Sequence, residues 1–139
     1  MEKISYISRS EKQTIEFASS ISKSFTGGEV LLLEGDIGAG KTRFTKGLAK
    51  GLKIKEAVTS PTFTIMQIYS GRLNLYHLDM YRIQSESELI ETGIYEALDD
   101  KNGITVIEWP QIAKALFDSP INVSIKIIDK NTREITVTK

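Results

Sequence analysis

The chain of 139 residues contains no cysteine, three prolines, and only one histidine and one tryptophan. Without cysteine it cannot form a disulfide framework or a Cys-ligated metal site, and this composition is consistent with a reducing cytoplasm. No apolar run approaches the roughly 20 residues that are needed to cross a bilayer, and the N-terminal segment has no long apolar stretch. We therefore expect a cytoplasmic protein that does not enter a membrane.

An excess of one charge is also missing, since 18 Lys and Arg residues balance 18 Asp and Glu residues. A protein that binds nucleic acid by itself usually carries a basic face, because neutralisation of the phosphate charges supplies most of the binding affinity. The basic residues are dispersed apart from Lys50, Lys53 and Lys55, which are typical of a solvated helix end. A small nucleic-acid patch at these lysines stays open as an alternative, but we do not expect direct binding.

The spacing of apolar residues and turn signals predicts one α/β domain over residues 1–139. Ser70 and Gly71 join two strand-like runs and predict a hairpin, so part of the sheet is expected to be antiparallel. Strands are predicted at residues 3–8, 30–33, 64–69, 73–78, 104–107, 121–127 and around 135–137. Helices are predicted from residue 10 to before Gly27, after Gly40, at 85–92, as a short turn at 95–98, and from about 110 to 117.

Residues 35–42 fill every position of the phosphate-binding pattern G-x-x-x-x-G-K-[ST]. An apolar strand precedes them and an amphipathic helix follows, which is the context that the pattern requires. Glycines let successive backbone amides converge on phosphate oxygens, while Lys41 reaches the β- and γ-phosphates and Thr42 offers a hydroxyl to Mg²⁺. The predicted nucleotide-binding residues of this loop are Asp36, Ile37, Gly38, Ala39, Gly40, Lys41, Thr42 and Arg43.

Two carboxylates follow predicted strands and are candidates for a second Mg²⁺ anchor, because open α/β sheets place ligands at the carboxyl ends of their strands. Glu108 follows a buried β-branched strand and is ranked first. Asp79 follows an alternating strand that is expected to be half exposed, and it is interpreted as a phosphate-side or water-positioning group. Either residue could also be an ordinary surface carboxylate.

Other polar and aromatic residues near these motifs have both functional and structural interpretations. The hydroxyls of Ser60 and Thr62 flank Pro61 and could meet phosphate or magnesium. Trp109 directly follows Glu108, so it is either a buried residue or an aromatic contact for the ligand. His77 is interpreted as a packed or hydrogen-bonded residue rather than a catalytic base.

Taken together, these motifs resemble the bacterial TsaE family, formerly called YjeE. The matching strings are GDIGAGKT at 35–42, SPTF at 60–63, HLDMYR at 77–82, the region at 91–93, and VIEWP at 106–110. Their order and spacing agree over essentially the whole chain. The resemblance implies a P-loop NTPase-like three-layer α/β fold with a mixed parallel and antiparallel sheet, ATP and ADP binding with Mg²⁺, and slow ATP hydrolysis by the isolated protein.

The resemblance also implies a role in tRNA processing and a protein partner. In the family, a TsaB–TsaD pair transfers a threonylcarbamoyl group to adenosine 37 of tRNAs that read codons beginning with A. TsaE binds that pair and supports repeated turnover rather than the transfer itself. We therefore expect TsaB–TsaD as the partner, with tRNA contacted only through it.

Site residues can be carried over from the resemblance position by position. Thr42 and Glu108 are implied as magnesium ligands, Lys41 as the phosphate lysine, Asp79 as an activity-linked carboxylate and Trp109 as a neighbour of the site. The adenine is expected between Ser10 and Glu11 on one side and Arg133 on the other. Two residues depart from the family pattern: Arg43 stands at a common second threonine, and Gln111 stands at a common acidic position.

Two other functions compete with a partner-dependent ATPase. A small-molecule P-loop kinase usually carries closely spaced arginines on a lid over the transferred phosphoryl group, and the five arginines here are scattered. A GTP-binding switch usually reads guanine with an Asn/Thr-Lys-x-Asp string, and the sequence contains none. The kinase is retained as the main alternative.

Overall fold

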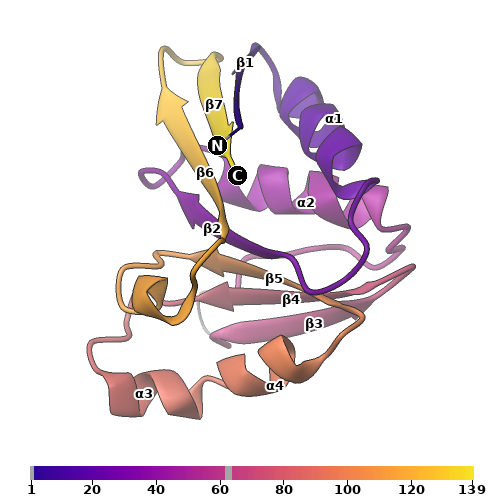
Figure 1. Cartoon of the computed structure of the whole chain (residues 1–139). Helices are drawn as coiled ribbons and strands as arrows, with labels where there is room; N and C mark the ends of the chain where they lie inside the picture. The colour runs from indigo at the N-terminus through magenta and orange to yellow at the C-terminus, as the bar shows by residue number, and fades with distance from the viewer. Residues whose placement is uncertain (1, 62–63) are drawn as a thin grey trace.

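In a computed structural model, residues 2–61 and 64–139 are described, and seven strands in these residues form one sheet with helices on both sides (Figure 1). The order along the sheet is β1-β7-β6-β2-β5-β4-β3. The strands are β1 (Lys3–Ser8), β2 (Val30–Glu34), β3 (Met66–Ser70), β4 (Asn74–Asp79), β5 (Gly103–Glu108), β6 (Ile121–Ile127) and β7 (Arg133–Thr138). The helices are α1 (Glu11–Ser22), α2 (Lys41–Gly51), α3 (Glu86–Glu91) and α4 (Ile94–Asp99).

The sheet is parallel at its centre and antiparallel at both sides. Strand β2 pairs in parallel with β5 and β6, and β5 pairs in parallel with β4. Strands β3 and β4 form the predicted hairpin, while β7 is antiparallel to both β6 and β1. Because β2, β4 and β5 run in the same direction, the loops that follow them meet at one edge of the sheet.

Two hydrophobic cores lie on opposite faces of the sheet, and strand β2 contributes to both. Leu31 and Leu33 pack into the core beneath α1 and α2, whereas Leu32 packs into the core that contains Leu89 of α3 and Ile94 of α4. This alternation follows from the two-residue period of a strand. The helix pairs α1/α2 and α3/α4 cover the two faces (Figure 1), so the predicted three-layer α/β fold with a mixed sheet is confirmed.

Local signals placed the starts of two helices correctly. The Ser10 side chain caps α1 by accepting from the Gln13 amide at 3.1 Å, and the Gln13 side chain accepts from the Arg9 amide at 2.7 Å. Ser85 caps α3 in the same way by accepting from the Glu88 amide. These side chains satisfy backbone donors that have no partner within the first helical turn.

The helix predicted from about residue 110 to 117 is wrong. Residues 111–113 form turns, and only Lys114–Leu116 form a short 3₁₀ helix. The Leu116 and Phe117 amides donate to carbonyls only three residues back, at Ala113 and Lys114, and Phe117 itself is extended, so the segment forms a short 3₁₀ turn in place of an α-helix. Helix α1 is also shorter than predicted, since it ends at Ser22 and leaves Phe25 in the following loop, where it still packs into the core.

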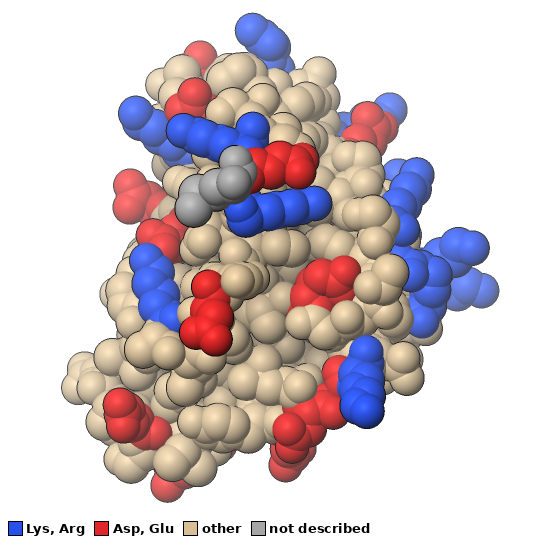
Figure 2. All heavy atoms as spheres, in the orientation of Figure 1, with Lys and Arg blue, Asp and Glu red and all other residues tan. Residues whose placement is uncertain are grey.

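Charged side chains of both signs are interspersed over the face seen in Figure 2. Basic side chains gather mainly in its upper part and at its right edge, while acidic ones prevail in the lower part, where Figure 1 places α3 and α4. The sequences of these two short helices, ESELIE and IYEALD, account for this acidic character. Among the helices of the described residues, none combines the length and apolar character of a membrane span.

Candidate nucleotide-binding site

The phosphate-binding pattern forms the turn between β2 and α2. Gly38 and Gly40 adopt φ values of +84° and +107°, in the left-handed region that side chains with a Cβ rarely adopt. The Ala39 amide donates to the Asp36 carbonyl at 3.0 Å and closes the turn. Within the described residues no side chain caps the start of α2, so its first amides and the positive end of its dipole are available to an anion.

A cavity of about 430 Å³ lies over this loop and collects residues from both ends of the chain. Ser60, whose hydroxyl was expected to meet phosphate or magnesium, lines it, and so do Thr14, Lys130 and Asn131, which are outside the predicted site. Thr14 lies one helical turn after Ser10, and Lys130 and Asn131 lie in the turn just before Arg133 of β7. The short sequence distance of each from a predicted site residue could have indicated it. The predicted residues that line the cavity are Ser10, Glu11, Ile37, Gly38, Ala39, Gly40, Lys41, Thr42, Arg43, Asp79, Glu108, Trp109 and Arg133.

One predicted binding residue is placed differently, and one cannot be compared. Asp36 lines a neighbouring depression, which Trp109 also lines, and its carbonyl supports the loop by accepting from Ala39. Thr62 lies outside the described residues.

The two candidate carboxylates lie side by side at the carboxyl ends of adjacent parallel strands. Asp79 of β4 is in register with Glu108 of β5. Glu108 is in turn in register with Leu33 of β2, the strand that leads into the phosphate loop. Both are buried, with 8% of Asp79 and 4% of Glu108 exposed. No residue of β4 is exposed, so the expectation of a half-exposed strand is wrong. The reason is that β4 packs into the cores on both faces of the sheet, through Leu75 on one face and Leu78 on the other.

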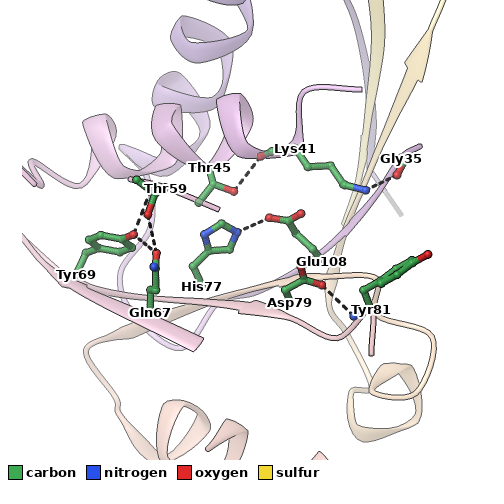
Figure 3. A network of polar contacts seen from close by, with 10 residues as sticks. All are labelled: Gly35, Lys41, Thr45, Thr59, Gln67, Tyr69, His77, Asp79, Tyr81 and Glu108. Carbon is green, nitrogen blue, oxygen red and sulfur yellow. Dashed lines mark hydrogen bonds and ion pairs between the residues drawn. The ribbon is translucent and has the colours of Figure 1, made fainter. Parts of the chain in front are cut away.

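Each carboxylate has a distinct hydrogen-bond partner (Figure 3). Asp79 Oδ1 accepts from the Tyr81 amide at 2.9 Å, which fixes the chain as it leaves β4. Glu108 Oε2 lies 2.5 Å from Nε2 of His77, whose side chain is fully buried. A backbone amide therefore holds the Asp79 carboxylate, whereas a side chain holds the Glu108 carboxylate.

The Lys41 side chain lies between the phosphate loop and these carboxylates. Its Nζ donates to the Gly35 carbonyl at 2.5 Å and lies 3.8 Å from the centroid of the Trp109 ring (Figure 3 shows the Gly35 contact). Burial lowers the pKa of the Lys41 amine from its ordinary value, and the negative charges of Glu108, Asp79 and Asp36 oppose that shift. A cation held in this way is suited to bind phosphate oxygens that enter the cavity.

Trp109 is held over the loop by an unusual backbone conformation and an aromatic neighbour. Its φ of +55° lies in the left-handed region, which a bulky residue seldom adopts. The ring meets Tyr81 edge to face with centroids 5.0 Å apart. Trp109 is half-buried and lines the cavity, so it is positioned as a contact residue rather than as part of the core.

Two arginines close the cavity at its sides. Arg43 Nη2 forms an ion pair with Glu11 Oε1 at 2.9 Å and links the starts of α1 and α2. Arg133 donates from Nε to the Ala39 carbonyl at 3.0 Å and from Nη2 to the Gly38 carbonyl at 3.2 Å. Arg133 therefore holds the tip of the phosphate loop from the far end of the chain, in addition to lining the cavity.

The sequence of the chain is similar to those of known proteins. The sequence profile of the family described as threonylcarbamoyl adenosine biosynthesis protein TsaE matches residues 8–135. The chain belongs to the TsaE family. The TsaE protein of Treponema pallidum is 40% identical over 132 residues, which cover 94% of this chain and 97% of that protein. The TsaE protein of Bacillus subtilis is 47% identical over 113 residues, which cover 80% and 70%.

A solved structure supports the same fold. The crystal structure of Bacillus subtilis YdiB superposes with a TM-score of 0.78 at 33% sequence identity, covering 98% of this chain and 84% of that one. The three-layer architecture is therefore shared along nearly the whole length of the chain.

The two departures from the TsaE pattern have different structural contexts. Arg43 makes the ion pair with Glu11 at the cavity wall, a contact that a threonine could not make. Gln111 is exposed after Pro110, and nothing in the structure explains its replacement of an acidic residue.

The oxygen donors of this TsaE-family site fit a magnesium ion. The Thr42 hydroxyl and the Glu108 carboxylate line the same cavity, and both are hard oxygen ligands of the kind that Mg²⁺ prefers. The described residues contain no cluster of three or more His, Cys, Asp and Glu that could hold a metal ion alone. Mg²⁺ usually keeps several waters and is bound by one or two carboxylates together with substrate phosphates.

Proposed function

We propose that the chain is a Mg²⁺-dependent ATPase that supports threonylcarbamoyladenosine modification of adenosine 37 in tRNAs reading ANN codons. It acts in the cytoplasm through a TsaB–TsaD complex, hydrolyses ATP slowly alone and is needed for repeated turnover. One observation carries the proposal: a phosphate loop, a buried lysine and two buried strand-end carboxylates surround one cavity. Family membership supports the pathway.

Each residue has a defined part in this proposal. The loop amides and Lys41 hold the β- and γ-phosphates, while the Thr42 hydroxyl and the Glu108 carboxylate hold Mg²⁺. When bound, that ion neutralises charge on the phosphate oxygens. Asp79 lies beside Glu108 and orients a phosphate-side group or the attacking water.

The nucleotide base is assigned to residues that line the cavity, and the partner to exposed apolar residues. Ser10 and Glu11 at the start of α1 and Arg133 in β7 form the adenine side for ATP or ADP. Ile37 at the tip of the loop is 80% exposed and Tyr81 is 59% exposed, so they offer apolar surface to a protein partner. The balanced charge of the chain favours contact with tRNA through that partner.

The arginine contacts do not favour the alternative of a P-loop kinase. Arg43 pairs with Glu11, and Arg133 donates to carbonyls of the phosphate loop. Arg72 donates to the carbonyl of Ser22, the last residue of α1, and to that of Phe25 in the following loop. These three side chains are therefore engaged with separate partners in the protein rather than grouped on one lid segment.

The proposal is tested by measuring Mg²⁺-dependent ATP hydrolysis with and without cognate TsaB–TsaD. We expect the partner to stimulate hydrolysis, and Lys41→Ala to lower the rate by about 100-fold or more, because it removes charge where charge develops. Glu108→Ala should impair hydrolysis and Mg²⁺ binding more than ADP binding. Lys50→Ala, an exposed lysine on the same helix, is the matched control.

Two results would contradict this assignment. Hydrolysis that persists in both Lys41→Ala and Glu108→Ala would show that the cavity is not the catalytic site. ATP hydrolysis that does not respond to TsaB–TsaD would remove the partner and the pathway, and a screen for phosphorylated metabolites would then test the kinase alternative.

A further inference from the structure

His77 lies directly behind the candidate magnesium carboxylate. It belongs to β4, where it is in register with Val106, two residues before Glu108 on the neighbouring strand. Its side chain is fully buried, and Nε2 is 2.5 Å from Glu108 Oε2. Figure 3 shows the Glu108 carboxylate between the His77 ring and the Lys41 side chain.

The other ring nitrogen of His77 distinguishes it from an ordinary packed histidine. Nδ1 is buried and has no hydrogen-bond partner among the described residues. A buried polar atom without a partner is unfavourable, and an apolar side chain of similar size would avoid that loss. The contact with Glu108 is therefore the one interaction in the described structure that explains an imidazole at this position.

We propose that His77 is a positioning residue for Glu108. With Glu108 ionised, Nε2–H donates to Oε2 and fixes the rotation of the carboxylate, so that the other oxygen is presented to the cavity. Partners of this kind orient metal ligands and restrict their motion. The inference rests on the proposed role of Glu108 as a magnesium ligand and adds a residue that touches neither the metal nor the nucleotide.

Three substitutions separate positioning from packing. In His77→Gln the side-chain amide reaches about as far as Nε2, whereas in His77→Asn it ends near the position of Nδ1, too far from Glu108. His77→Leu keeps bulk without a donor. Urea midpoints of all three report how much each substitution affects folding.

The first readout compares ADP affinity in EDTA with the Mg²⁺ concentration that gives half-maximal ATP hydrolysis. We expect His77→Asn and His77→Leu to raise that Mg²⁺ concentration about 10-fold, at the lower end of the effect of removing such partners from metal ligands. His77→Gln should recover most of the loss. ADP affinity without metal should stay within about twofold of wild type, since His77 does not line the cavity.

The second readout uses the wild-type protein and does not depend on any variant folding. His77 is the only histidine in the chain, so ¹⁵N-histidine labelling gives one pair of ring resonances that needs no assignment between residues. We expect Nε2 to be protonated and Nδ1 to be unprotonated. Protonation of Nδ1 alone would overturn the proposal, because Nε2 could not then donate to Glu108.

The outcomes distinguish this inference from the proposed function. If wild-type hydrolysis does not depend on Mg²⁺, the proposed function fails and the inference fails with it. If wild type depends on Mg²⁺ but folded His77→Asn has the same Mg²⁺ requirement, the positioning role alone is wrong. If His77→Asn and His77→Leu do not fold, the wild-type tautomer decides, because protonation of Nδ1 alone would overturn the proposal.

Discussion

Replacing Gly47 with alanine tests how closely α1 and α2 approach each other. Gly47 lies in α2 and faces α1, and a Cβ atom there would lie 2.3 Å from the Ile15 carbonyl oxygen and 2.6 Å from the Ala18 Cβ. Ordinary contacts begin at 3.4 Å, so α1 must move by about 1 Å. The obstacle is backbone, which cannot rotate away as a flexible side chain can.

The magnitude follows from two opposing effects. Overpacking a well-packed core costs about 1–3 kcal/mol, and the rigid carbonyl places this site at the upper end of that range. Alanine is a better helix former than glycine by about 1 kcal/mol, which offsets part of the loss. We therefore expect Gly47→Ala to lower the free energy of unfolding by about 2 kcal/mol.

Urea unfolding followed by circular dichroism measures this change. With a denaturant slope of about 2 kcal/mol per molar urea, the midpoint should fall by about 1 M. Lys50→Ala in the same helix is exposed and should change the free energy by no more than about 0.5 kcal/mol. A Gly47→Ala midpoint equal to or above that of wild type would refute the close helix crossing.

Three further outcomes test other contacts. Arg133→Gln removes the guanidinium that holds the Gly38 and Ala39 carbonyls, so calorimetric ADP affinity should fall about 10-fold; unchanged affinity would mean that the loop keeps its shape unaided. ADP should change the fluorescence of the single Trp109 by drawing Lys41 Nζ from its ring, and no change in a titration would contradict that contact. Hydrogen bonds from Asn74 and Tyr76 lower the pKa of Asp100, so its carboxylate should stabilise the fold above the unfolded pKa of 3.8 and lose this effect as the pH falls through its lower folded pKa. The difference in urea midpoint between wild type and Asp100→Asn should therefore shrink in acid, and a constant difference would exclude this origin.

Features that depend on residues close together in the sequence were predictable from the sequence alone. The capping pair of Ser10 and Gln13 marks the start of α1, and the glycines of the phosphate loop permit the left-handed turn before α2. Strand β2 could be read from its continuous apolar run, and the β3–β4 hairpin from Ser70 and Gly71. These signals are local because helix capping, turn formation and side-chain periodicity each act over a few residues.

The candidate site was only partly predictable for the same reason. Local patterns indicated Lys41, Asp79 and Glu108 separately, and the resemblance to the TsaE family assigned them to one site. Neither indicated that Glu108 would meet His77 or that Arg133 would hold the phosphate loop. The sequence also suggested a helix over 110–117 that the structure limits to a short 3₁₀ turn.

The phosphate loop, its flanking strand and helix, and the residue types suited to phosphate and magnesium all follow from local sequence patterns. Which of those residues meet depends on the folded arrangement of the whole chain. Parallel pairing of β4 with β5 places His77 behind Glu108, and the β6–β7 turn brings Arg133 to Ala39, 94 residues away. Such contacts depend on strand order and on packing across the whole domain, which short-range propensities do not encode.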